Sequence, residues 1–147
     1  MTEQRTTDYK RPSVQKADEL PFLDQDQTSQ ARRYAGVTPR NTEAEHLWFG
    51  KVYTAVGEAS DPHHHGIAET GGYVLQGSAF LRFGERFEEI VYADEGDFIF
   101  VPPHMPHIEG NASRTKELIW LTTRQPDNIV VNLHDQDVAD IEIDYRD

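Results

Sequence analysis

The sequence has no cysteine, few basic residues and no long hydrophobic run. Among its 147 residues the absence of Cys excludes disulfides, thiolate nucleophiles and sulfur ligands, so any bound metal must be held by nitrogen and oxygen. No segment approaches the ~18 apolar residues that a membrane span needs, and no apolar signal segment follows Met1. We therefore expect a cytoplasmic protein that has no membrane partner.

The chain is strongly acidic. It contains 14 Lys and Arg against 26 Asp and Glu, which gives a formal net charge of -12. The basic residues are scattered along the chain and form no cluster. Such a charge repels nucleic acid and anionic lipid, so we expect no nucleic-acid partner.

Two regions of the chain differ in their polarity and hydrophobic pattern. Residues 1–40 are polar and are interrupted by Pro12 and Pro21, which predicts a partly irregular N-terminal arm whose one apolar cluster, "ELPFL", is an edge element or a subunit contact. Residues 41–147 consist of short β-rich runs separated by turn residues. This pattern predicts one all-β domain, a sandwich or a barrel, and no segment has the apolar periodicity of a major helix.

The stretch "DPHHHGIAET", residues 61–70, carries three consecutive histidines. In an extended segment His63 and His65 share a face while His64 points the other way, so two imidazoles converge. Two imidazoles hold a metal weakly. Glu69 is the nearest candidate for a further ligand, and His107, after a Pro-rich turn, is the best distant one. The alternative is a histidine cluster on a surface loop without a function.

The spacing of these residues resembles the two motifs of the cupin superfamily. The first motif is a glycine, five residues, His-x-His, three or four residues, Glu, six residues and a glycine. The second is a glycine, five residues, Pro-x-Gly, two residues, His, three residues and Asn. The matching residues are Gly57, His63, His65, Glu69 and Gly77 in the first motif, and Gly96, Pro102, His107 and Asn111 in the second.

This resemblance implies a single-domain, RmlC-like cupin: an all-β jelly-roll barrel, or double-stranded β-helix, here with an extended N-terminal arm. It also implies a divalent transition metal in the barrel, held by His63, His65, Glu69 and His107. Fe(II) is the metal we expect first, with Mn, Ni or Zn as alternatives. Relatives of this kind often pair through their outer sheets, so we expect a homodimer.

Two positions depart from the motifs. Seven residues separate Glu69 from Gly77, and Thr70 is the residue that six residues separate from Gly77. If Glu69 is a ligand, a bulge at Gly71 and Gly72 must absorb the extra residue; otherwise the site is a three-histidine one. His104 stands where the family has a glycine, and it is a candidate proton shuttle or an exposed, idle side chain.

Other side chains are candidates for the cavity. Glu109 lies two residues past His107 and shares its face, which makes it a candidate acid or base. Arg82 is a candidate clamp for a substrate carboxylate if it points inward, and a solvated arginine if it does not. Tyr73 and Trp48 are candidates to line the substrate cavity, although most strand aromatics are expected to be plain core.

The resemblance implies a metal-dependent enzyme. We expect an Fe(II)-type dioxygenase or a related oxidoreductase that acts on a small enolic or aromatic substrate. The alternatives are a non-catalytic cupin that binds a small molecule, and an isomerase, epimerase or lyase built on the same barrel.

Overall fold

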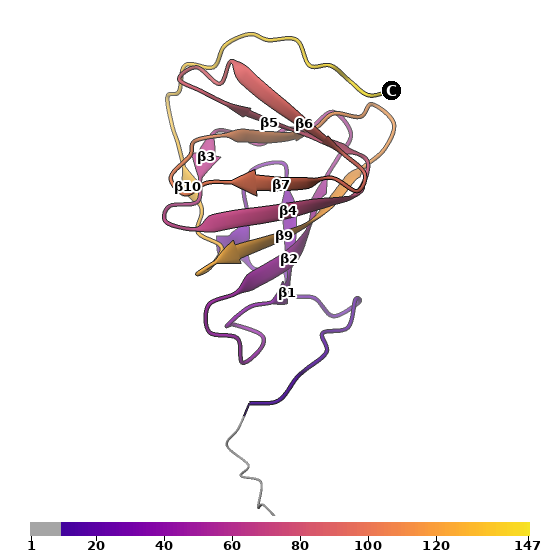
Figure 1. The fold of residues 1–147 in the computed structure, drawn as a ribbon, viewed down its shortest axis with the longest axis vertical. Coiled ribbons are helices and arrows are strands. Elements are labelled where there is room, and N and C mark those ends of the chain that lie inside the picture. Colours follow the sequence, from indigo (N-terminus) through magenta and orange to yellow (C-terminus); the bar gives the residue numbers. More distant parts are fainter. Residues whose placement is uncertain (1–9) are drawn as a thin grey trace, which may run out of the picture.

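The computed structural model describes residues 10–147, and these residues form an all-β barrel, as the sequence predicted (Figure 1). The first nine residues of the expected arm lie outside the described residues. Within residues 10–147, one 3-10 turn, η1, precedes the strands. The elements are η1 (Asp24–Asp26), β1 (Arg32–Val37), β2 (Trp48–Thr54), β3 (His63–His64), β4 (Glu69–Gln76), β5 (Ser78–Phe83), β6 (Glu89–Asp94), β7 (Phe98–Val101), β8 (Ile108–Asn111), β9 (Leu118–Gln125) and β10 (Val131–Asn132).

The strands form two layers of a jelly roll. One layer is a five-stranded antiparallel sheet in the order β1-β2-β9-β4-β7. The other contains the three-stranded sheet β6-β5-β8 and the pair β10-β3. A backbone bridge between His63 and His107, with N–O distances of 3.1 and 2.9 Å, connects these two smaller sheets. The backbone itself therefore brings the two histidine segments side by side.

Alternation along the strands separates an inner from an outer face. The inner side chains of β2, β4, β5 and β9 are buried together between the layers, with Trp120 and Leu118 of β9 packed among small and branched residues. Along β9 the inward positions continue as Thr122 and Arg124, both of which are buried. The core thus changes from apolar to polar toward the end of β9 that bears the arginine.

Strand β1 lies within the segment that the sequence predicted as an arm over residues 1–40. It pairs with β2 in the five-stranded sheet, so the sheet begins before the expected boundary at residue 41. The segment "ELPFL" lies along this strand: the Ala35 amide donates to Pro21 at 2.9 Å, and the rings of Phe22 and Tyr34 are 5.4 Å apart. The sequence did not predict strand β1 because a charged residue, Arg33, occupies an inward position of this strand.

The C-terminal segment, residues 133–147, runs across the outside of the three-stranded sheet (Figure 1). Ile143 packs against a second apolar cluster that contains Phe80, Phe87, Ile108 and Ala112. Hydrogen bonds from Ala139 N to Arg86 O and from Arg146 N to Ala112 O fix this segment. The outer face of this sheet is therefore covered by the chain's own C-terminal segment.

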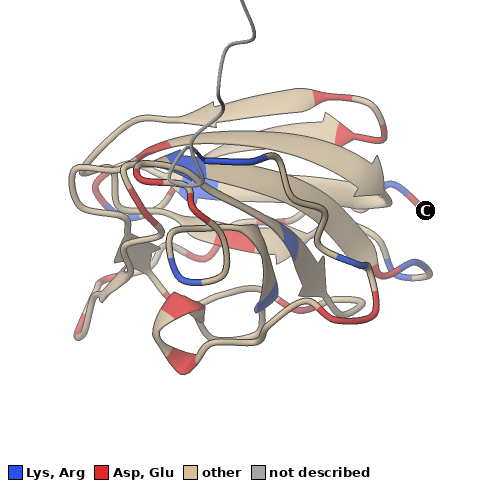
Figure 2. Ribbon diagram, turned by 90° about the horizontal axis from the view of Figure 1, so that it is seen from below, with Lys and Arg blue, Asp and Glu red and all other residues tan. Residues whose placement is uncertain are grey.

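The outer face of the five-stranded sheet is different. Phe98 and Phe100 on the edge strand β7 are 81% and 63% exposed, and Phe49 on β2 is also exposed. Acidic residues lie in many of the turns, and Lys and Arg are dispersed among the elements (Figure 2). Over residues 10–147, no helix has the length and apolar character needed to cross a membrane.

Candidate metal centre

Three buried histidines meet inside the barrel. His63 belongs to β3, His65 follows it in the turn before β4, and His107 immediately precedes β8. One ring nitrogen from each lies within 4.8 Å of the other two. Nitrogens bound to one first-row ion are separated by about 3 to 4 Å, because each bond is about 2.0–2.1 Å long. The three side chains therefore form a site that can hold a divalent metal.

Backbone carbonyls fix the tautomer of each imidazole. Nδ1 of His63 lies 2.9 Å from Asp61 O, Nδ1 of His65 lies 2.6 Å from Ile129 O, and Nδ1 of His107 lies 3.0 Å from Met105 O. A carbonyl oxygen can only accept, so Nδ1 carries the proton in each ring. Every Nε2 therefore carries the lone pair, which is the tautomer that metal-binding histidines need.

Burial also keeps these rings neutral. It lowers the pKa of His63 to about 3, against the opposing charge of Glu109. It lowers the pKa of His65 and His107 as well. Because metal ligation requires the neutral imidazole, protons do not compete with a metal for these nitrogens at neutral pH.

The best evidence that the site fits a metal is a pair of orphaned atoms. Nε2 of His63 and Nε2 of His107 are buried and have no hydrogen-bond partner among the described residues. A buried acceptor left without a partner costs free energy, and a cation shared by the three Nε2 atoms would remove that cost. The donor set of three imidazoles suits Fe, Mn, Ni, Zn or Cu.

Glu109 supplies a carboxylate next to the histidines. Its two oxygens lie 4.0 Å from Nε2 of His63 and 3.9 Å from Nε2 of His107. Burial would raise its pKa, but interactions with Arg33 foremost, and then with the histidines and Arg124, outweigh that effect and lower it to about 2. Arg33 of β1 forms the closest contact, with Nη2 2.5 Å from Oε1. Glu109 is therefore ionised. It lies on the same inward face as His107.

A second buried arginine lies against His65. Nη2 of Arg124 is 3.0 Å from His65 Nε2, and its Nη1 donates to Asn128 Oδ1 at 2.7 Å. Burial, followed by repulsion from Arg33, lowers the pKa of Arg124 to about 9, so it remains charged at neutral pH. Asn128 in turn donates to the carbonyl of Asp26 at 2.9 Å. These bonds form a continuous polar network that ends at a histidine of the site.

Trp48 belongs to the same network and not to an open cavity wall. Its side chain is fully buried, and Nε1 donates to Asp26 Oδ2 at 3.1 Å. The other oxygen of Asp26 accepts from Arg40 at 3.0 Å. Trp48 therefore lies on the inward face of β2 and belongs to the polar network. It does not contact His65, because Asp26, Asn128 and Arg124 lie between them in this network.

The structure does not bring Glu69 to the histidines. Glu69 is exposed on the outer face of β4, while its neighbour Thr70 is buried on the inner face. The bulge expected at Gly71 and Gly72 is absent from that point, because both glycines keep regular pairing with β9. The register shift occurs later, between Val74 and Gln76, and so it leaves Thr70 facing inward. The carboxylate next to the histidines is that of Glu109.

Three further predicted site residues also lie away from the histidines. His104 is exposed, with a positive φ of 60° that keeps the family's glycine turn, and its ring lies near His64. Arg82 points to the outer side of β5, where it donates to Phe87 O at 2.9 Å and to Ala139 O at 2.5 Å. Tyr73 contacts Phe98 on the outer face of the large sheet. His104 thus lies in an exposed turn, and Arg82 and Tyr73 lie on the outer faces of their strands.

The sequence reasoning missed Arg33 and Arg124. The signal for Arg124 was present, because Leu118, Trp120 and Thr122 precede it at alternate positions of one strand. Alternation indicates that the arginine shares their inward face. Arg33 gave a weaker signal, since Ala31 and Ala35 are its only buried companions at alternate positions.

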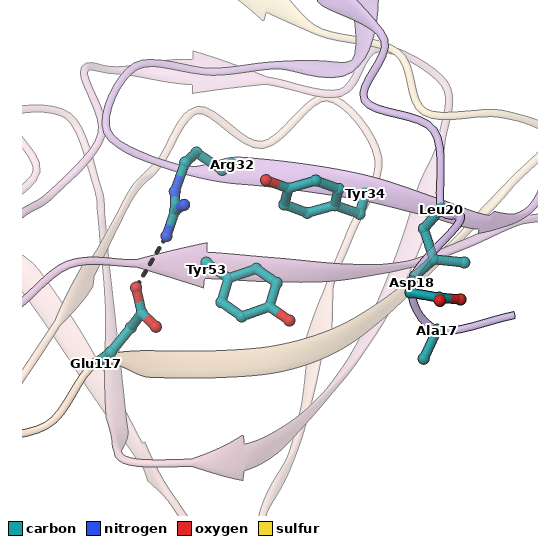
Figure 3. A pocket seen from close by; sticks show the side chains of 7 residues that line it. All are labelled: Ala17, Asp18, Leu20, Arg32, Tyr34, Tyr53 and Glu117. Carbon is teal, nitrogen blue, oxygen red and sulfur yellow. Dashed lines mark hydrogen bonds and ion pairs between the residues drawn. The ribbon is translucent and has the colours of Figure 1, made fainter.

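A separate groove lies outside the barrel, between the N-terminal segment and the first two strands (Figure 3). Its volume is about 300 Å³. Arg32 closes one end through an ion pair of 2.9 Å with Glu117. Tyr34 and Tyr53 line it from the outer face of the sheet. The groove therefore lies on the opposite face from the buried Arg33 and does not reach the histidines.

Comparison with known proteins agrees with this geometry. The family model described as "Cupin domain" matches residues 50–124. KdgF from Halomonas sp. is similar in structure, with a TM-score of 0.60 and 20% identity over 78% of this chain and 94% of that one. An RmlC-like cupin from Shewanella frigidimarina has a TM-score of 0.60 and 19% identity over 80% and 93%.

Oxalate decarboxylase from Bacillus subtilis, which contains Mn(II) centres, is also similar. Its TM-score is 0.61, with 20% identity over 73% of this chain and 29% of that longer one. No curated protein matches the sequence. At these identities the likeness to solved structures supports the fold, whereas the family match spans just over half of the chain. The chain therefore belongs to the cupin family.

Proposed function

We propose that this cupin is a metal-dependent enzyme that acts on a small enolic or aromatic substrate, with Fe(II) as the metal and dioxygen as the co-substrate. The observation that carries the proposal is the convergence of three neutral Nε2 atoms, two of which have no partner among residues 10–147. Three protein ligands leave open positions on a six-coordinate ion. A bound Fe(II) supplies Lewis acidity and the electrons for dioxygen chemistry.

The side chains around the site have separate tasks in this proposal. His63, His65 and His107 hold the ion, and their carbonyl partners keep each Nε2 directed at it. Glu109 is the acid or base, since its ionised carboxylate is the one that approaches two of the histidine nitrogens. Arg33 orients Glu109 through their contact. The surrounding burial excludes water from the reaction.

Turnover measurements test this proposal. Protein stripped of metal and reloaded with Fe(II) without air is supplied with enolic and aromatic acids in an oxygen electrode. We expect oxygen uptake by the wild type, loss of turnover but retention of iron in Glu109→Gln, and unchanged turnover in Arg82→Gln, whose side chain lies outside the barrel. Substrate loss without oxygen uptake would replace the dioxygenase with a lyase or isomerase. Ligand binding without any turnover would leave a non-catalytic binding cupin.

We further propose a homodimer in the cytoplasm. The support for a second copy is the exposed apolar face of the large sheet, where Phe98, Phe100 and Phe49 are unusually accessible. This face includes β7, the strand at one edge of the five-stranded sheet.

Light scattering tests the dimer. We compare the wild type with the double variant Phe98→Ser, Phe100→Ser, and we expect a dimeric wild type and a monomeric variant. A monomeric wild type would contradict the proposal.

A further inference from the structure

Arg124 is a buried cation that has no carboxylate of its own. Its side chain is 2% exposed. Glu109 pairs with Arg33, and Asp26 pairs with Arg40. Among residues 10–147, no Asp or Glu oxygen forms an ion pair with Arg124. A buried charge without a counter-ion is costly, and an anionic ligand that paired with Arg124 would remove that cost.

One nitrogen of this guanidinium contacts a histidine of the metal centre. Nη1 is held by Asn128, while Nη2 contacts His65 Nε2 and Nε has no hydrogen-bond partner among the described residues. A metal on His65 would take the Nε2 lone pair that Nη2 now uses. Nε and Nη2 would then both be available, and these two N–H groups form the parallel fork that binds a carboxylate with two hydrogen bonds.

Thr70 adds a second polar group at the same place. It is 4% exposed, and its hydroxyl is also buried without a hydrogen-bond partner among residues 10–147. In the register of β4 with β9, Thr70 lies directly opposite Arg124. Residues opposite each other on adjacent strands share a face, so the hydroxyl and the guanidinium lie next to each other on the inward face of the sheet.

We propose that Arg124 and Thr70 form a carboxylate subsite beside the three histidines, so that the substrate is a small carboxylic acid whose other oxygen donors reach the metal. The inference rests on the proposed function and narrows its substrate class. It also assigns a role to the contact between Arg124 and His65: the arginine is engaged by the histidine until a metal binds, and metal binding makes it available for the anion.

One test of the subsite uses no metal. In chelator-treated protein, His65→Ala removes the acceptor that engages Nη2, so pyruvate, the probe, is expected to bind by calorimetry. In His65→Ala with Arg124→Gln, the affinity should fall at least about tenfold, since a charge-assisted pair of hydrogen bonds is lost. In His65→Ala with Thr70→Val, the fall should be about three- to tenfold. This arm is independent of whether the protein is a metal enzyme.

The second test uses the full chain loaded with Mn(II). The wild type should bind pyruvate at least about tenfold more tightly than the uncharged pyruvamide, and Arg124→Gln should abolish this preference without changing the manganese content. Arg82→Gln, a loss of an arginine outside the barrel, should retain it. Absence of metal uptake would refute the proposed function alone. Pyruvate affinity that is unchanged by Arg124→Gln in both preparations would overturn the subsite.

Discussion

Arg33 and Glu109, 76 residues apart in the sequence, form a fully buried ion pair with Nη2 2.5 Å from Oε1. The pair joins the strand of the N-terminal segment to the strand that follows the third histidine. Arg33 also donates to Thr28 at 2.7 Å, so the guanidinium has further polar support. The N-terminal segment is thereby a part of the metal centre's surroundings.

Replacing Arg33 with Met should destabilise the metal-free protein by about 3–5 kcal/mol, because Glu109 is left buried and unpaired. The double variant with Glu109→Gln should recover a large part of that loss. The matched control is Arg32→Met, which breaks the exposed pair with Glu117 and should cost at most about 1 kcal/mol. Urea denaturation measures all three, and equal losses for Arg33→Met and Arg32→Met would contradict the buried role of the pair.

Arg82 should behave as a structural residue. Its guanidinium donates to the carbonyls of Phe87 and Ala139 and so ties the C-terminal segment to β5. We expect Arg82→Ala to lower the free energy of unfolding by about 1–3 kcal/mol, since two buried carbonyls lose their donor. Metal content, measured on the same sample, should not change. Loss of metal without loss of stability would contradict this structural role and would indicate that Arg82 acts on the metal site.

The attachment of the C-terminal segment at Asp147 should depend on pH. Hydrogen bonds from the hydroxyls of Ser113 and Thr115 and from the amide of Arg114 lower the pKa of this carboxyl from 3.8 to about 2. Because the folded pKa is below the unfolded one, the stabilisation is complete above about pH 4 and is lost as the pH falls toward about 2.

The difference in denaturation midpoint between the wild type and Asp147→Asn, followed against pH, tests this linkage. It should be constant above about pH 4 and should shrink between about pH 4 and pH 2. A difference that persists unchanged down to pH 2 would show that the carboxylate is not the group that holds the segment.

The sequence was sufficient to predict the barrel and the three histidines. His63 and His65 share a face because strand residues alternate. His107 was predicted from the spacing of Gly96, Pro102 and Asn111 around it. Whether Glu69 is a fourth ligand could not be predicted in the same way. Whether Glu69 or Thr70 faces inward depends on where a single bulge falls in β4, and the pairing with β9 decides that.

The buried arginines show a second limit of sequence reasoning. Arg33 and Arg124 are tolerated inside the barrel because partners distant in sequence, Glu109 and Asn128 with His65, satisfy them. Charge at an inward position argues against burial until those partners are known. Arg82 is a candidate carboxylate clamp only if it points inward, and the alternation along its strand does not show which of the two faces is the inner one.

Metal analysis of protein expressed without a polyhistidine tag tests the central claim most directly. Wild type, His107→Ala and Glu69→Ala are compared after purification and after incubation with Fe(II) or Mn(II). The three-histidine site predicts one ion per chain in the wild type and in Glu69→Ala, and loss of the ion in His107→Ala. A wild type that takes up no metal would contradict the account, and loss of metal in Glu69→Ala would contradict the ligand set.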